Sequence, residues 1–412
     1  MSRILDAVMP PRLGRDFRWL LGSSWVSQVG DGIALAAGSL LIASQTHDPF
    51  LVAMGALLQR LPWLLFGLYA GVVADRLDRL VVVVAVDVMR AVVLGVLVLA
   101  LATGVVNIGL VLVVLFLFGT AEVFADTTSS TLLPMVVAKR DLGVANARLT
   151  AGFVTVNQML GPPVGAALFA AGMAWPFVAQ AVCVLLGAAL IAKMRLPAVP
   201  APEEPKRVRH DILEGLRWTW RHPAVRTLTL TIVAFNITFG AAWSVLVLYS
   251  LKTLDMGEVG FGLLTTAGAI GGLVAIGSYD WLERHFSLGN IMRVGLIIET
   301  FTHLALALNR SGLGAIVIMF VFGAHAFVWG TTSRTVRMRA VPTEFQGRVG
   351  SVYLVGVFGS MVIGTALGGV IAGAWGIVAP FWFAFVGSAL LVVLIWRQMP
   401  HIAHADEALV RG

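Results

Sequence analysis

Ionisable side chains lie inside long apolar stretches at several points of the sequence. Asp31, Arg60 and Glu122 occupy such positions in the first half, and His325 does so in the second. Because a charged side chain at the centre of a membrane span costs at least about 2.5 to 3.5 kcal/mol, each of these residues needs a partner or a function. Carboxylate and imidazole groups can bind and release protons there. Asp31, Glu122, Arg60 and His325 are therefore our candidates for a proton-coupling site, with a buried hydrogen bond as the alternative for His325.

Asp31 and Arg60 are predicted to lie at similar depths. With a rise of about 1.5 Å per helical residue, Asp31 lies about 20 Å from the inner membrane surface and Arg60 about 15 Å from the outer one. An ion pair between them that never opens would be structural. A pair that opens when another molecule enters would let Asp31 take up a proton, and we favour this second interpretation.

Further charges lie on the third and fourth apolar segments. Glu122 and Asp126 are four residues apart and therefore share one helix face. Asp87 and Arg90 lie at a comparable depth, and the sequence leaves Asp87, Glu122 and Asp126 open as partners of Arg90. We interpret Asp87 and Arg90 as structural.

These residues are set in helices that span a membrane. The 412-residue chain is 58% hydrophobic and 12% charged, with a mean hydropathy of +0.89, which excludes a soluble globular protein. Its single cysteine, Cys183, excludes an intramolecular disulfide and a cysteine-based metal site, and we expect no metal and no cofactor. Since a spanning helix needs about 20 mostly apolar residues, the sequence predicts an all-α membrane protein with twelve transmembrane helices, at 17–44, 50–73, 81–103, 108–133, 147–171, 174–194, 224–250, 258–282, 288–309, 312–338, 346–373 and 377–397.

The basic residues are distributed asymmetrically about the predicted membrane. The isoelectric point is near 10.2, which could indicate a nucleic-acid partner. All but four of the 29 Lys and Arg residues fall on one side of the membrane, the exceptions being Lys252, Arg310, Arg60 and Arg90. By the positive-inside rule that side is the cytoplasm, which then holds both termini. The basic charge therefore requires no nucleic acid.

The chain divides into two similar halves. A polar interval from 195 to 223 begins Pro-rich and ends in a predicted amphipathic helix, with Leu216 and Trp220 on its apolar side. The stretch 116–131 aligns without gaps on 320–335, including the triplet Thr-Thr-Ser. We predict an N-terminal six-helix bundle at 1–195, a cytoplasmic linker at 196–222, a C-terminal six-helix bundle at 223–397 and a cytoplasmic tail at 398–412.

The turn after the second span concentrates charge. Its sequence, GVVADRLDRL, matches the pattern Gly-x-x-x-Asp-Arg-x-x-Arg at Gly71, Asp75, Arg76 and Arg79. Together with the two parallel halves, this turn resembles the major facilitator superfamily. The resemblance implies a conformational latch, in which Gly71 allows close helix approach and Asp75 meets the positive end of a helix in the other half. Arg79 would pair with Asp126, and the alternative is a simple positive-inside turn.

The fifth predicted span carries a second motif of this superfamily. NQMLGPPVGAAL resembles the antiporter pattern Gly-Pro-x-x-Gly-Gly at Gly161, Pro162 and Gly165, although Ala166 replaces the last glycine. Small residues would let helices approach closely, and the prolines would bend the span. Helix packing alone would also explain these residues, so an antiport role and a structural role both stay open.

Other segments narrow the resemblance. SQVGDGIALAAGSLL at 27–41, GTAEVFADTTSSTLLP at 119–134 and GRVGSVYL at 347–354 are similar to the branch that contains macrolide exporters, enterobactin exporters and related actinobacterial drug pumps. This implies a monomeric transporter in a bacterial inner membrane, with a small-molecule substrate and protons as partners. Polar and aromatic residues on spans expected to face the centre are candidates for the substrate cavity: Gln28, Asn157, Gln158, Asn236, Trp243 and Trp329.

The sequence thus predicts a secondary active transporter that performs proton-coupled efflux of a lipophilic small molecule, such as an antibiotic, by alternating access. A siderophore or lysophospholipid exporter of the same superfamily and a non-transporting membrane receptor or scaffold are the alternatives. An intramembrane enzyme would need a cluster such as His-Glu-x-x-His, and an ATP-driven pump would need the loop Gly-x-x-x-x-Gly-Lys-[Ser/Thr]. The sequence contains neither, so we expect no enzyme. The substrate stays open, because fold and family do not determine it.

Overall fold

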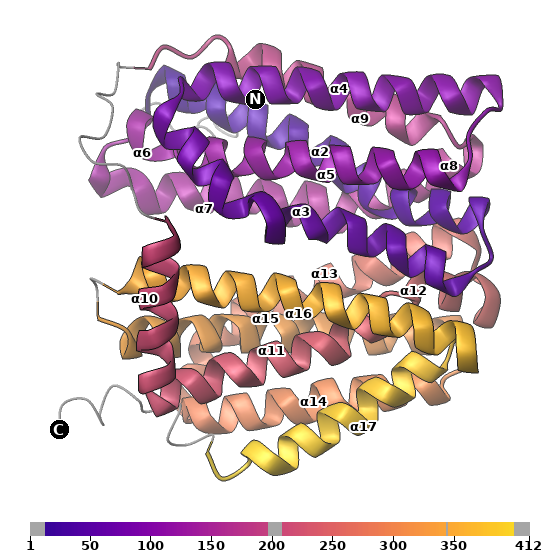
Figure 1. Cartoon of the computed structure of the whole chain (residues 1–412), viewed down its shortest axis with the longest axis vertical. Coiled ribbons are helices and arrows are strands. Elements are labelled where there is room, and N and C mark those ends of the chain that lie inside the picture. The colour runs from indigo at the N-terminus through magenta and orange to yellow at the C-terminus, as the bar shows by residue number, and fades with distance from the viewer. Residues whose placement is uncertain (1–12, 197–207, 343–344, 399–412) are drawn as a thin grey trace. The chain divides into compact units, whose positions relative to one another are not determined.

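The apolar segments form helices in the computed structural model of the chain, which describes residues 13–196, 208–342 and 345–398 (Figure 1). Within these ranges nine helices are long and apolar enough to cross a membrane, and the shorter α9 (Trp175–Ile191) and α17 (Ala379–Ile395) match the sixth and twelfth predicted spans. The fifth predicted span consists of α7 (Leu142–Gly152), η3 (Phe153–Leu160) and α8 (Gly161–Ala171) in succession. The all-α membrane fold is confirmed.

The chain forms two compact units. Unit 1 comprises Met1–Gln45 and Pro62–Lys206, and unit 2 comprises Thr46–Leu61 and Arg207–Gly412. The division at 206 falls inside the predicted linker. Residues 46–61 are grouped with unit 2, so the boundary between the units divides the helix α3 (Pro49–Arg76). The predicted N-terminal bundle at 1–195 contains the whole of this helix. The predicted tail lies outside the described residues from 399 onward.

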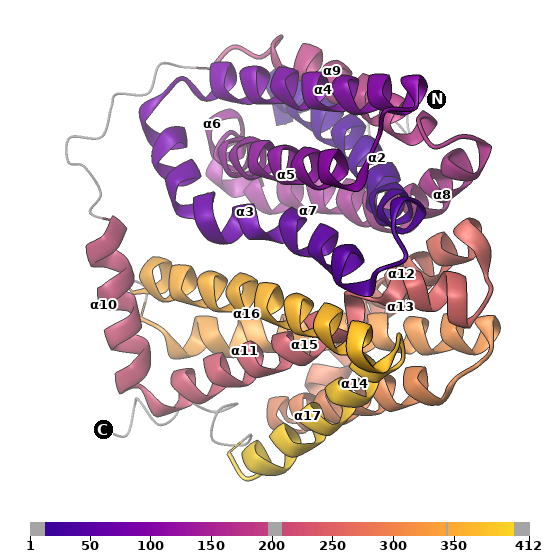
Figure 2. The ribbon, with the colours of Figure 1, turned by 45° about the vertical axis from the view of Figure 1, so that its right-hand side comes forward.

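In unit 1, α2 packs against α8 and α9, and α4 packs against α5 and α9. Figure 2 shows α4 and α9 side by side. Local capping explains where these helices begin and end. The Asp78 carboxylate accepts the N–H groups of Leu80 and Val81 at the start of α4, and Gly104 ends that helix with a left-handed φ of 72°. Of these helices, α2 spans Gly14–Gln45, α4 spans Arg79–Thr103 and α5 spans Ile108–Ser130, and the short helix α6 (Leu133–Val136) follows α5.

In unit 2, α11 packs against α16, α13 against α15, and α14 against α15 and α17. The predicted amphipathic helix is confirmed as α10 (Val208–Arg221), where Leu213, Leu216 and Trp220 are exposed. Such an exposed apolar face suits a helix that lies on a membrane surface. The other elements are α11 (Pro223–Trp243), α12 (Leu246–Leu248), η4 (Tyr249–Thr253), α13 (Gly257–His285), α14 (Leu288–Leu308), α15 (Gly312–Ala340) and α16 (Gln346–Trp375).

Candidate functional site

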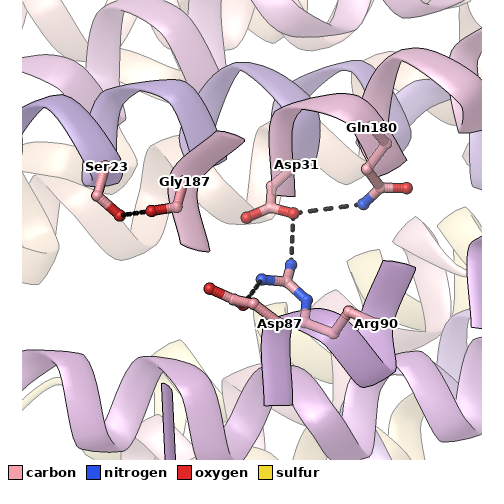
Figure 3. A network of polar contacts seen from close by, with 6 residues as sticks. All are labelled: Ser23, Asp31, Asp87, Arg90, Gln180 and Gly187. Carbon is pink, nitrogen blue, oxygen red and sulfur yellow. Dashed lines mark hydrogen bonds and ion pairs between the residues drawn. The ribbon is translucent and has the colours of Figure 1, made fainter. Parts of the chain in front are cut away.

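A network of charged side chains joins three helices of unit 1 (Figure 3). Arg90 Nη2 on α4 donates to Asp31 Oδ1 on α2 at 2.6 Å, and Arg90 Nη1 donates to Asp87 Oδ1 at 3.1 Å. Gln180 Nε2 on α9 donates to the same Asp31 oxygen at 3.3 Å. The side chains of Arg90, Asp87 and Asp31 are only 2%, 5% and 13% exposed. One buried guanidinium therefore holds two carboxylates from two helices, and we call these four residues the Asp31 network.

Helix α4 presents two members of this network on its buried face. Asp87 and Arg90 are three residues apart, so they point in nearly the same direction and can pair on one helix. Leu94 and Leu97 continue the buried face, whereas Val92 is exposed on the opposite side. The helix thus turns apolar residues outward and its charges inward, as a membrane-spanning helix must.

Asp31 is flanked by two glycines that bring other segments close to α2. A Cβ built on Gly30 would lie 2.8 Å from Cys183 Cβ on α9, and a Cβ built on Gly32 would lie 2.6 Å from the Asn157 carbonyl oxygen in η3. Any larger residue would push these segments away from α2. The two glycines therefore set the position of Asp31 relative to α9 and η3, and with it the distance to Gln180.

Two more carboxylates influence Arg90 electrostatically. Glu122 and Asp126, both on α5, attract the Arg90 guanidinium in addition to the bonded Asp31 and Asp87. The Phe118 ring of the same helix lies 4.6 Å from Arg90 Cζ, in range for a cation–π interaction. Among the partners that the sequence left open for Arg90, Asp87 accepts a hydrogen bond from it.

The structure gives Asp31 a partner that the sequence did not name, and an ion pair with Arg60 stays a prediction. Asp31 bonds Arg90, whereas Arg60 belongs to unit 2, where its Nη1 lies 3.9 Å from Met361 Sδ. The expectation rested on depth along the helix axes. Depth does not determine which way a side chain points around its axis, and Arg90 points toward α2.

The charged turn at 71–80 has local structural contacts. Arg79 Nε donates to the Ala74 carbonyl oxygen at 3.0 Å, and Arg79 Nη1 lies 2.9 Å from Met135 Sδ. The first contact joins the end of α3 to the start of α4, and the second joins the start of α4 to α6. The expected pairing of Arg79 with Asp126 stays a prediction.

The structure describes the other residues of the expected latch only in part. A Cβ built on Gly71 would meet no heavy atom within 4 Å in the described part of the chain, and the close approach expected there in the latch stays a prediction. Arg76 is exposed at the end of α3. The side chain of Asp75 lies outside what the structure describes.

The small residues of the fifth span bring α8 against α2, as expected. A Cβ on Gly161 would lie 2.5 Å from Gly32 Cα, and a Cβ on Gly165 would collide with the Ile33 backbone. Pro162 has no N–H to donate within the helix, and the residues before it form the π-helix η3. The packing role of this motif is confirmed, while its antiport role stays a prediction.

Some predicted cavity residues lie around a cavity in unit 2. Helices α11, α14 and α15 line this cavity of about 220 Å³, which includes Asn236 and Trp329 in its wall. His325 also lines it, and His325 Nε2 lies 3.5 Å from Glu299 Oε2. The expected proton-relay candidate of the second half therefore has a carboxylate partner that the sequence left unassigned.

The other predicted cavity residues have different surroundings. Trp243 stacks on Phe239 with ring centroids 4.4 Å apart. Asn157 is 7% exposed and accepts a hydrogen bond from Gln158 Nε2 at 2.6 Å. Gln28 is half-buried on α2.

Sequence reasoning missed Gln180 and the bond between Arg90 and Asp31. The sequence did indicate that other segments approach Asp31 closely, because Gly30 and Gly32 flank it on α2. Nothing in the sequence identifies Gln180 as the neighbouring residue that bonds it. The identity of such a neighbour depends on helices that are 149 residues apart in the chain.

Comparisons with known proteins cover nearly the whole chain. Residues 8–410 match the profile of a family described as transmembrane secretion effector. The chain belongs to this family. The chain is 27% identical to the multidrug efflux pump Tap of Mycolicibacterium fortuitum, with 94% of this chain and 97% of Tap covered. It is 23% identical to the enterobactin exporter EntS of Shigella boydii, with 95% and 96% covered.

Solved structures agree on the fold of the chain. A bacterial homologue of the iron transporter ferroportin, in an inward-facing state, gives a TM-score of 0.73 at 16% identity, covering 93% of this chain and 98% of that one. A bacterial homologue of the human lysosomal transporter Spinster gives 0.72 at 13% identity, covering 98% of both chains. The protein is thus a membrane transporter of the major facilitator type, similar to exporters, and it is not an enzyme.

Proposed function

We propose that this protein exports a lipophilic small molecule in exchange for protons and that Asp31 binds the proton. The proposal depends on one observation, that Asp31 and Asp87 share the single guanidinium of Arg90. With both carboxylates ionised, these three groups carry one excess negative charge. Because an uncompensated charge inside a membrane is costly, the arrangement favours the uptake of one proton.

Of the two carboxylates, Asp31 is the one that an entering proton can reach more readily. Its side chain is 13% exposed, compared with 5% for Asp87. Both of its hydrogen bonds end on Oδ1, and Oδ2 has no partner among the described residues. A proton on Oδ2 would weaken the attraction between Asp31 and Arg90. Arg90 would keep Asp87 as its counter-ion, so the change leaves no charge unpaired.

The protonation of Asp31 would be coupled to alternating access. We propose that the six-helix bundles at 1–195 and 223–397 are the two moving halves and that both termini lie in the cytoplasm. A monomer in a bacterial inner membrane is sufficient for this cycle. The latch of Gly71, Asp75, Arg76, Arg79 and Asp126 would favour closure on the cytoplasmic side, and protonation of Asp31 would favour the other state.

The relatives support two substrate classes. Tap is named a multidrug efflux pump, and EntS is named an enterobactin exporter. We place a lipophilic drug first, because aromatic side chains make up much of the wall of the unit 2 cavity and suit an apolar substrate. A siderophore is the second candidate.

The test uses a pump-deficient bacterium that expresses wild type, Asp31→Asn or Asp48→Asn. Asp48 is an exposed carboxylate that accepts the Phe50 N–H at 2.9 Å, a contact that an asparagine oxygen can also make, so Asp48→Asn is the matched control. Growth inhibition is measured with macrolides, tetracyclines, aminoglycosides and lipophilic cations, and siderophore release is measured in parallel. Purified protein in liposomes with an internal pH dye reports proton exchange when substrate is added.

We expect wild type and Asp48→Asn to confer resistance and to exchange protons, and Asp31→Asn to do neither at equal expression. Resistance that survives in Asp31→Asn would refute the role of Asp31. Siderophore release without drug resistance would support the second substrate class. Strains that match the empty vector in every assay would refute both substrate classes.

A further inference from the structure

The cavity of unit 2 combines a carboxylate with aromatic rings. Phe235 and Phe239 contribute from α11, Phe322 and Trp329 from α15, and Glu299 from α14. Among the lining residues that the structure describes there is no Lys or Arg. The formal charge on the wall is therefore negative, unless the neighbouring His325 is protonated.

The aromatic rings form a connected group next to the carboxylate. The Phe239 and Phe322 centroids are 5.9 Å apart at an interplanar angle of 12°, and Trp243 lies 4.4 Å from each of them. The face of an aromatic ring carries partial negative charge, and several rings around one space bind alkylammonium groups. Rings and carboxylate therefore favour the same kind of guest, a cation with an apolar surface.

Glu299 has a weak partner in the present arrangement. Its 12% exposed side chain lies 3.5 Å from His325 Nε2, whereas charge-assisted hydrogen bonds of this type are typically about 2.7 to 2.9 Å long. A buried carboxylate inside a membrane needs a stronger counter-ion than that. An organic cation in the cavity would supply it without displacing an existing strong bond.

The size of the cavity limits the guest. A volume of about 220 Å³ is below the range of about 300 to 1,000 Å³ that holds a whole drug-sized ligand. We propose that this cavity binds an alkylammonium group, either as a small organic cation or as the cationic end of a larger amphiphile. As a statement about the exported substrate, this rests on the proposed export function.

The experiment measures binding alone, so it needs no transport. Purified full-length protein in detergent is equilibrated with radiolabelled choline, and competition is measured with unlabelled choline and with 3,3-dimethylbutan-1-ol, its uncharged isostere. The variants are Glu299→Gln, Phe322→Leu and Glu258→Gln. Glu258 is an exposed carboxylate in the first turn of α13 and serves as the matched control. Melting temperature and gel-filtration profile establish that each variant is folded.

We expect Glu299→Gln to weaken choline binding about thirtyfold or more, because it removes a buried charge from the site. Phe322→Leu keeps an apolar side chain but loses one ring, so a loss of about two- to thirtyfold is expected. Glu258→Gln should bind as wild type does, and the uncharged isostere should compete poorly.

Three results would overturn the inference: wild type that does not bind choline, Glu299→Gln that is folded and binds as wild type does, or an isostere that competes as well as choline. Each would leave the proposed export function intact if drug resistance still depends on Asp31. Choline binding that depends on Glu299, in a protein that exports nothing, would instead uphold the site and refute the export function.

Discussion

Replacing Gly32 by alanine tests whether close packing positions the Asp31 network. The added Cβ would lie 2.6 Å from the Asn157 carbonyl oxygen and 2.7 Å from Asn157 Cα. Both are backbone atoms, so no side chain can rotate away and η3 has to move relative to α2. Gly22→Ala on the same helix is the matched control, because its Cβ would meet only Leu190 Cδ1 at an ordinary 3.7 Å.

The magnitude follows from comparing the two variants. Each replaces a helical glycine and gains about 0.8 to 1 kcal/mol of helix propensity, so this term cancels in the difference. The remaining cost of overpacking is about 1 to 3 kcal/mol. We therefore expect Gly32→Ala to be less stable than Gly22→Ala by about this amount, and to lose export because Asp31 moves relative to Gln180 and Arg90.

Thermal unfolding of the purified proteins in detergent measures the difference, and the resistance assay measures export. Gly22→Ala should melt at or above the wild-type temperature and keep its activity. Equal melting temperatures and equal activities of the two variants would refute the reasoning, since α2 and η3 would then tolerate a methyl group between them.

Three further predictions concern the same unit. Arg90→Met leaves Asp31 and Asp87 buried without their cation and should destabilise the protein by about 3 to 5 kcal/mol. Adding Asp31→Asn to this variant should restore part of the lost melting temperature. A double variant that is no more stable than Arg90→Met would contradict this prediction. Arg90→Lys should also impair export in liposomes, because the lysine ammonium has one nitrogen and cannot bond two carboxylates through two separate nitrogens as the guanidinium does. Full activity of Arg90→Lys would contradict a role for the bonds that Arg90 makes to both Asp31 and Asp87. Asp78→Ala removes the cap of α4 and should lower stability by about 1 kcal/mol without changing export, whereas lost export at unchanged stability would assign Asp78 a role beyond capping.

The internal repeat illustrates how far sequence patterns reach. The aligned triplets Thr-Thr-Ser place Thr128 and Thr332 at equivalent positions, and both side chains are 0% exposed. Equivalent positions in the two halves thus have equivalent burial at the threonines, as expected if the pattern reflects a repeated helical unit.

The sequence predicted which charged residues belong to the candidate site better than it predicted which of them bond one another. Asp31 and Arg90 are conspicuous in the sequence, because charges are rare in apolar segments. Asp87 and Arg90 could be paired from their spacing of three residues on one helix. The pairing of Asp31 with Arg90 crosses 59 residues and could not be read from spacing.

Sequence alone determined the properties that arise from local composition and periodicity: a membrane protein, the positions of its spans, an amphipathic helix in the linker and the family. These follow from the free energy of transferring about 20 consecutive residues into a bilayer, which needs no knowledge of neighbouring helices. Tertiary structure alone decided that Arg90 bonds Asp31 and that Glu299 lines a cavity with aromatic rings. The physical reason is that a helix can rotate about its axis without changing its depth, and only packing against other helices determines that rotation.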